Sequence, residues 1–289
     1  MLGLWFHRKF VLQGLSSNAQ CRSMKKHLLS GVSVIALAIT TPAIAAPPAP
    51  FVYNWTGFYV GGNVGYSWGN ANNSYNEPAF GTVTGLPTSF SSSEWLNGVI
   101  GGVQAGYNWQ ANVNTVLGFE ADIQGSGERG HTGFSNPYTF TVSDCEGPCI
   151  GHGTLTQTQQ AKILWFGTVR GRAGILVNPT TWLYATGGLA YGQISVSGTV
   201  TDTACTPSPT VACMWSYGNS ATNVGWTVGA GIEGAFPNSR NWTWKLEYLH
   251  VDLGTVSGNG FDTDFGGPYS WSTRITDDIF RVGFNYGFH

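Results

Sequence analysis

The chain has 289 residues, of which only 10% are charged, whereas 41 are glycines and 14% are aromatic. So few charges are unusual for a soluble surface and are typical of an exported β-protein. Without residues 1–45 the chain keeps eight of its 13 basic and all 15 acidic residues, a formal charge of −7, which excludes a basic surface that binds nucleic acid.

Residues 1–45 have the pattern of a cleaved signal peptide. Lys25 and Lys26 precede the apolar run 32–39, and residues 43–45 supply the small-x-small pattern of a cleavage site. The apolar run is too short for a membrane helix, which needs about 20 residues. We therefore expect an exported chain without a helical anchor.

Alternation of apolar with small or polar side chains predicts eight β-strands, because successive side chains of a strand point to opposite faces. A tilted membrane strand needs about 9 to 11 residues. In the fourth segment Ile163 is expected on the apolar face and Lys162 on the other. In chain order the predicted strands are 57–68, 95–109, 117–124, 162–175, 182–196, 226–236, 244–248 and 279–289.

The connections alternate in length. Short ones lie at 110–114, 178–180 and 237–241, whereas long polar ones lie at about 69–93, 126–160, 198–222 and 254–275. Membrane barrels combine short periplasmic turns with long extracellular loops. The predicted fold is therefore all-β: an eight-stranded antiparallel up-and-down transmembrane β-barrel with four long extracellular loops.

The domain boundaries follow from these elements. Met24 is an alternative translation start, in which case residues 1–23 are a misannotated extension. The proline-rich residues 46–54 are expected to form a flexible periplasmic lead-in. Residues 55–289 are expected to form the outer-membrane barrel as one domain.

The ionisable residues of the strands indicate which face is enclosed. A soluble, lipocalin-like barrel also alternates but turns its apolar face inward. Eight ionisable side chains inside the strands lie on the non-apolar face, and four are acidic and four basic, which suits a lumen because buried charges need partners. The predicted lumen network comprises Glu120, Asp122, Arg170, Arg172, Glu233, Lys245, Glu247 and Arg281.

Aromatic residues near the strand ends are typical of the girdles of membrane barrels. The predicted interfacial aromatics are Trp68, Trp95, Trp109, Trp226, Trp244, Tyr286 and Phe288. A soluble periplasmic barrel or a lectin-like sandwich remains the alternative fold.

Four segments, residues 55–69, 184–192, 244–254 and 281–286, resemble strands of a known family. They are similar to the small alphaproteobacterial outer-membrane barrels, the rhizobial and Brucella-type outer-membrane immunogenic or porin-family proteins. The resemblance covers residues 52–289 and implies a Gram-negative outer-membrane location, surface antigenicity and an envelope or host interaction. The chain departs from the family in having His289 after Phe288, and in having His250 where the family more often has an aromatic.

Several functions are compatible with this fold. An eight-stranded barrel is just wide enough for its own side chains, which favours a non-enzymatic structural and surface-display role without cofactor or metal. A narrow porin-like ion channel lined by the lumen charges is the alternative. The expected partners are outer-membrane lipid, lipopolysaccharide and, through the C-terminal strand, the barrel-assembly machinery; the partner of the loops is not identified by the sequence.

A lipid-modifying enzyme is a weaker hypothesis. His250 is expected to face outward near the extracellular rim, and a histidine beside a carboxylate can activate a serine or water, but no motif fixes a serine nearby. The rim acids could instead hold Ca²⁺ or Mg²⁺, although simple solvation is favoured. These acids are Asp252, Asp262, Asp264, Asp277 and Asp278.

Four cysteines of the exported part lie in two of the predicted loops, as Cys145 with Cys149 and Cys205 with Cys213. In an oxidising compartment this arrangement predicts two local disulfides. A zinc site that includes His131 and His152 fits the spacing less well.

Overall fold

The computed structural model describes residues 52–79, 86–142, 149–204, 213–262 and 266–288. By its contacts the chain forms two units, residues 1–48 and 49–289; the first, with the predicted signal peptide, lies outside the described residues. Within those ranges no helix combines the length and the hydropathy that a bilayer crossing requires. The strands are β1 (Gly57–Asn76), β2 (Ser89–Gln110), β3 (Thr115–Ser126), β4 (Arg129–Val142), β5 (Cys149–Asn178), β6 (Thr181–Asp202), β7 (Cys213–Ala235), β8 (Trp242–Asp262) and β9 (Gly267–Phe288).

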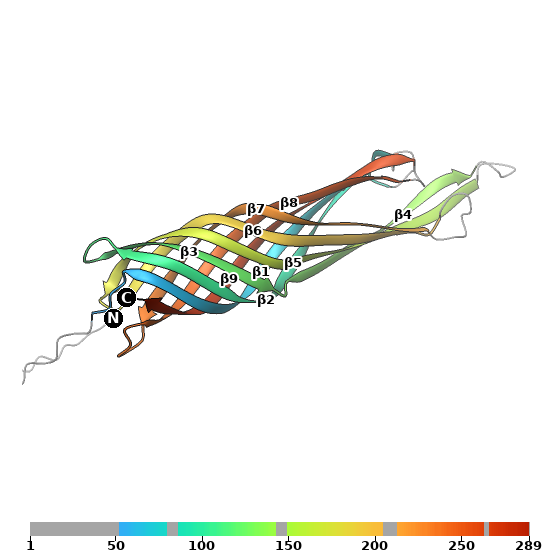
Figure 1. Ribbon diagram of the computed structural model, residues 1–289. Coiled ribbons are helices and arrows are strands. Elements are labelled where there is room, and N and C mark those ends of the chain that lie inside the picture. Colours follow the sequence, from blue (N-terminus) through green and yellow to red (C-terminus); the bar gives the residue numbers. More distant parts are fainter. Residues whose placement is uncertain (1–51, 80–85, 143–148, 205–212, 263–265, 289) are drawn as a thin grey trace, which may run out of the picture. The chain divides into compact units, whose positions relative to one another are not determined.

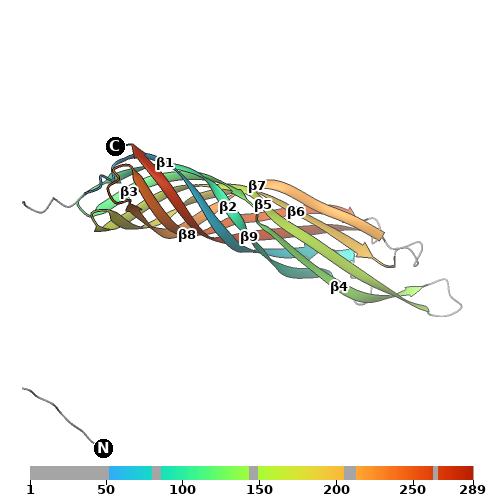
Figure 2. The same cartoon turned by 90° about the horizontal axis from the view of Figure 1, so that it is seen from below.

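The strands form one antiparallel sheet that closes on itself as a barrel (Figures 1 and 2). β1 pairs with β2 on one side and with β9 on the other, and the order β9, β8, β7, β6, β5, β3, β2 leads back to β1. β4 takes no separate place in this ring, because it continues β3 along the same neighbour, β5. The barrel therefore has the eight predicted strand positions, one of which β3 and β4 share.

The two ends of the barrel differ in their connections. Phe58, in the first strand, pairs with Phe288 in the last, so both chain ends of the barrel lie at one end. The three short connections at 111–114, 179–180 and 236–241 lie at this end as well. We call it the proximal end, and the end that carries the β1–β2, β4–β5, β6–β7 and β8–β9 hairpins the distal end.

The strands continue well beyond their predicted limits. β1 runs to Asn76 and β5 has 30 residues, so the prediction of long loops is wrong for most residues of the four segments. Side chains still alternate there, but the polar ones now face outward and the apolar ones inward: Asn72 and Ser74 face outward, whereas Ala71 and Tyr75 are buried. These distal parts of the strands were missed in the sequence because their apolar side chains lie on the inner face instead of the outer one.

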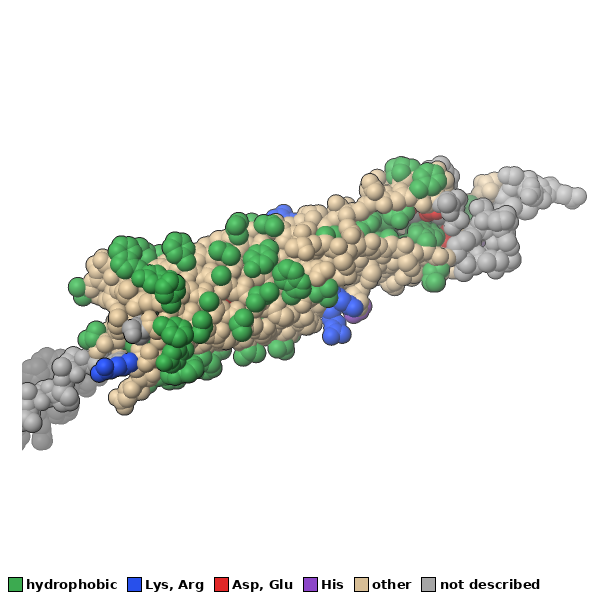
Figure 3. Space-filling view, viewed as in Figure 1, with side chains coloured by type: hydrophobic (Ala, Val, Ile, Leu, Met, Phe, Trp, Pro, Cys, Tyr) green, Lys and Arg blue, Asp and Glu red, His purple; other side chains and the backbone are tan. Residues whose placement is uncertain are grey.

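The outer surface accordingly has two zones (Figure 3). Near the proximal end the exposed side chains are large and hydrophobic, and we call this zone the apolar belt. In the distal half most outward side chains are polar and most apolar ones point into the interior, as in a water-soluble barrel. The belt includes Phe58, Val60, Val64, Val99, Val103, Tyr107, Phe119, Ile123, Val169, Leu189, Val228, Phe280 and Phe284; the distal interior includes Tyr75, Leu155, Ile163, Val196, Trp271 and Ile275.

An aromatic cluster fills the proximal mouth. Trp55 packs against Trp182 with ring centroids 5.8 Å apart, and Tyr53 contacts Trp55 edge-on at 4.7 Å. All three side chains are buried, together with Val116. The chain is thus packed from Tyr53 onward, which lies within the segment predicted to be a flexible lead-in; residues 46–51 lie outside the described ranges.

Candidate functional site

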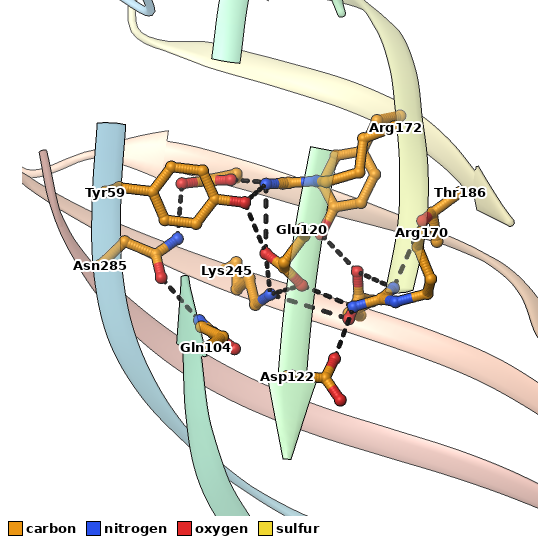
Figure 4. A network of polar contacts seen from close by, with 12 residues as sticks. Tyr59, Gln104, Glu120, Asp122, Arg170, Arg172, Thr186, Lys245 and Asn285 are labelled. Atoms are coloured by element: carbon orange, nitrogen blue, oxygen red, sulfur yellow. Dashed lines mark hydrogen bonds and ion pairs between the residues drawn. The ribbon is translucent and has the colours of Figure 1, made fainter. Parts of the chain in front are cut away.

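The eight ionisable residues of the predicted lumen network all point into the barrel and are buried. They come from five strands: two from β3, two from β5, one from β7, two from β8 and one from β9. The strand alternation places each of them inward while its sequence neighbours face the belt. Figure 4 shows most of these side chains meeting in one group, which we call the ionic cluster.

Glu120 lies at the centre of this cluster. The Lys245 ammonium donates to both of its carboxylate oxygens, at 2.7 and 2.8 Å, and Arg170 approaches to 2.5 Å. The Tyr59 hydroxyl donates to the Glu120 Oε2 at 2.8 Å. Gly106 leaves room for the Tyr59 ring, because a Cβ there would lie 2.4 Å from the phenolic oxygen.

Two further carboxylates bind the arginines that face Glu120. Glu247 accepts from Arg281 at 2.6 Å, from Arg170 at 3.0 Å and from the Tyr184 hydroxyl at 3.0 Å. Asp122 accepts from Arg281 at 2.8 Å and from Arg170 at 3.0 Å. Each guanidinium therefore bridges carboxylates of different strands, and the cluster ties opposite walls of the barrel together.

Glu233 and Arg172 form the proximal part of the cluster. Their side chains are 2.5 Å apart. Glu233 also accepts hydrogen bonds from Thr243 at 2.6 Å and from Asn285 at 2.8 Å. The Arg172 guanidinium lies 4.1 Å from the centroid of Tyr184 and 4.7 Å from that of Trp182, so the ionic cluster adjoins the aromatic cluster of the mouth.

The cluster balances four carboxylates against four cations. A buried charge without a partner costs several kcal/mol, whereas a paired and hydrogen-bonded one is tolerated. At the proximal mouth, the cavity between Tyr53, Trp55, Tyr59 and Glu233 holds only about 10 Å³, about the space of one water molecule. The arrangement therefore packs this part of the lumen with side chains.

Sequence reasoning missed a second group of buried acids on the distal side of the cluster. Glu94, Glu128 and Asp277 are buried there, and the Ser67 hydroxyl donates to Asp277. Glu94 and Glu128 fell outside the predicted strand cores, and Asp277 was assigned to the rim. The continuing period-two alternation of β2 and β9 was the signal that could have placed two of them inward.

The rim residues separate into inward and outward sets. Asp262 is buried in the barrel as Asp277 is, so their prediction as rim acids was wrong; Asp264 lies outside the described residues. Asp252 pairs with Arg274 at 2.6 Å. Among the described residues, no group of three His, Cys, Asp or Glu side chains has an arrangement that could hold a metal ion.

His250 faces outward at the distal edge of the belt, as its parity predicts. Its Nδ1 lies 2.8 Å from the Asp278 Oδ1, and the Tyr248 hydroxyl donates to the same oxygen at 2.7 Å. The imidazole packs on Trp226 at a centroid distance of 5.5 Å. The contacts with Asp278 and Trp226 hold the imidazole on the outer face. Over the described ranges, no hydrogen bond joins His250 to a serine hydroxyl.

The predicted interfacial aromatics all reach the outer surface. Trp68, Trp95, Trp109, Trp226 and Phe288 are exposed, and Trp244 and Tyr286 are half-buried. Cys145 and Cys205 lie outside the described residues, and so do the side chains of Cys149 and Cys213. The two predicted disulfides therefore stay predictions.

Comparison with known proteins gives a consistent result. A family model described as outer membrane protein beta-barrel domain matches residues 34–288. The 31 kDa outer-membrane immunogenic protein of Brucella melitensis is 35% identical over 89% of this chain and 94% of its own length. The 22 kDa outer membrane protein of Rhizobium leguminosarum is 29% identical over 81% of this chain and 79% of its own length. Among solved structures, the outer membrane protein OprG of Pseudomonas aeruginosa covers 82% of this chain and 98% of its own at 8% identity and a TM-score of 0.39, too remote to carry an argument.

Proposed function

The chain belongs to the outer-membrane β-barrel family, and from that premise we propose that it is a non-enzymatic structural protein of the Gram-negative outer membrane that displays its distal hairpins at the cell surface. The observation that carries the proposal is the ionic cluster. Glu120 contacts Lys245, Arg170 and Tyr59, and through such contacts the side chains of the lumen link different strands. Such a lumen stiffens the barrel and leaves its proximal mouth filled.

The distal half supports the display role. Both chain ends of a barrel of this kind are periplasmic, so the distal hairpins project from the outer leaflet. β4 and β5 pair as far as Val142 and Cys149, well beyond the belt residue Ile123 on β3. The relatives from Brucella are named immunogenic proteins, and surface exposure of these hairpins would account for antigenicity here too.

Ion conductance tests the structural role against the channel alternative. We expect the purified barrel, reconstituted in a planar bilayer, to give no discrete current steps, because salt-bridged side chains occupy its lumen. Arg172→Gln and Glu233→Gln variants serve as the comparison. Steps in the unmodified protein whose ion selectivity changed in these variants would establish a pore and overturn the proposal.

Epitope tags test the display role. A tag inserted between residues 207 and 208, in the β6–β7 connection, should bind antibody on intact cells. The matched control carries the same tag in the proximal turn between Asn238 and Ser239, which should be detected only after the outer membrane is permeabilised. The reverse result would place the distal end in the periplasm.

A further inference from the structure

The basic residues outside the ionic cluster are few, and two of them lie together. Residues 46–289 contain eight lysines and arginines, of which four belong to the cluster. Arg274 is paired with Asp252, and Arg240 lies in the proximal turn between β7 and β8. The remaining two, Arg129 and Lys162, are direct partners in the β4–β5 ladder.

Two local irregularities bring this pair to the outer surface. β3 ends at Ser126 and β4 begins at Arg129, whose side chain is exposed. On β5 a register shift between Ile163 and Trp165 turns Ile163 inward and Lys162 outward. The prediction that Ile163 faces outward and Lys162 inward is therefore wrong. The reason is a β-bulge, which inserts one residue and so exchanges the inward and outward positions beyond it.

The pair lies where the apolar belt ends. Leu164 on β5, Val99 on β2 and Ile123 on β3 are the exposed apolar residues on its membrane side. Beyond Lys162, outward residues of β5 such as Gln160 and Thr158 are polar. Figure 3 shows basic side chains and a histidine grouped at the distal edge of the apolar belt. Trp95, 69% exposed, is an aromatic of the kind found at the headgroup level of a membrane.

The two adjacent positive charges of Arg129 and Lys162 favour the binding of an anion. Like charges directly opposite each other on neighbouring strands repel. Within the part of the chain that the structure describes, neither Arg129 nor Lys162 takes part in an ion pair. Asn97, the Cα partner of Arg129 on β2, accepts from Tyr66 at its Oδ1, which leaves its amide N–H groups able to donate.

We propose that Arg129 and Lys162, flanked by Asn97, bind a phosphate group of a lipid in the outer leaflet. A guanidinium donates two parallel hydrogen bonds to phosphate oxygens, and an ammonium adds a point charge. The belt below the pair meets acyl chains, so a phosphorylated headgroup reaches the pair without leaving the membrane. The inference rests on the proposed structural role in the outer membrane, and it adds a specific lipid contact to that role.

Lipid retention tests this inference. The full-length barrel, folded in phosphatidylcholine vesicles with a small fraction of bis-phosphorylated lipid A, is extracted in mild non-ionic detergent, and bound lipid A is counted by native mass spectrometry. We expect Arg129→Gln with Lys162→Gln, which removes two charge-assisted contacts, to weaken retention by more than about tenfold, since the loss of one such contact already corresponds to about tenfold. Arg240→Gln, an exposed cation at the opposite end, is the matched control and should retain lipid normally.

A retention measurement and a competition measurement identify the group that is bound and its source. Lipid A freed of its phosphates should not be retained, and inorganic phosphate should displace bound lipid A only at far higher concentration than a second phosphorylated lipid. Equal retention of the dephosphorylated lipid, or by the double variant, would overturn the inference. Heat-modifiable gel migration and tag exposure report separately on the barrel and its display, so a failure of the proposed function is recognised independently.

Discussion

Glu120 shows how one buried carboxylate organises its surroundings. Its two oxygens accept from Lys245, Arg170 and Tyr59 at 2.5 to 2.8 Å. The side chain is fully buried, so protein donors replace water around it, and Arg172 at 3.3 Å and Arg281 at 3.4 Å lie close as well. Since the donors belong to β8, β5 and β1, the carboxylate connects strands that are not neighbours in the ring.

Glu120→Gln should destabilise the barrel strongly, because it leaves the buried cluster with one uncompensated positive charge. We expect a loss of about 3–5 kcal/mol in the free energy of unfolding, measured by urea titration in lipid vesicles. The double variant Glu120→Gln with Lys245→Met restores neutrality and should lose less than the sum of the single variants. Strict additivity of the two losses would mean that charge balance does not matter in this lumen.

Glu77 makes the distal end sensitive to pH. Burial and the neighbouring Asp262 carboxylate raise the pKa of Glu77 from 4.5 to about 7. The folded carboxyl thus holds its proton more tightly than the unfolded one, so stabilisation is fully present below pH 4.5 and is lost as the pH rises to about 7. The groups that face it are Tyr75, which donates to it at 2.7 Å, and Asp262.

Amide exchange, corrected for its intrinsic rate at each pH, should show this loss at the bond from the Glu77 N–H to the Thr88 carbonyl, 2.8 Å long. We expect protection there to fall between pH 4.5 and 7 and to level off above. Glu77→Gln carries no titratable proton and should abolish the trend. A pH dependence that survives in this variant would assign the transition to another group.

At the scale of elements, the junction between β3 and β4 depends on close backbone approach. A Cβ on Gly98 of β2 would lie 2.6 Å from the backbone of Gly127 and of Glu128, a distance that requires the chain to shift. We expect Gly98→Ala to cost about 1–3 kcal/mol by overpacking, measured as the urea midpoint. Gly62→Ala on β1 is the control, because its nearest neighbour atom would be 3.7 Å away; an equal loss in both variants would contradict the account.

The same elements show how far the sequence predicts the fold. The number of strand positions, their order and the side of the sheet on which most side chains lie could be predicted from the alternation in segments such as 57–68. The pattern is clear there because lipid requires large apolar side chains on the outer face. The distal halves were missed because water replaces lipid there, and Ala71 and Tyr75 then take the inner face. Lys162 was placed on the wrong face because a bulge leaves no sequence mark, and contacts such as Glu120 to Lys245 depend on strand tilt, which alternation does not determine.

At the scale of the whole molecule, the outer surface of the barrel suits lipid in its proximal half and water in its distal half. Its proximal half turns hydrophobic side chains outward around an ionic interior, and its distal half turns mostly polar side chains outward around an interior of apolar side chains and a few buried acids. The β1–β2 ladder runs through this change without a break, from Gly57 to Asn76. On β1 the boundary is therefore set by side chains alone, and Trp68, 38% exposed, is the last apolar residue on its outer face.

An arginine scanned along the outer face of one strand should report this boundary directly. Val103→Arg places a charge within the belt and should reduce the free energy of unfolding in vesicles by about 2–4 kcal/mol. Ser91→Arg lies on the same face of β2, beyond Trp95, and should change it by less than about 0.5 kcal/mol, as expected at a water-exposed site. Because both variants add the same side chain to the same strand, their difference isolates the surrounding solvent. A similar loss at both positions would mean that lipid also covers the distal half, and the polar outward residues there would then need another explanation.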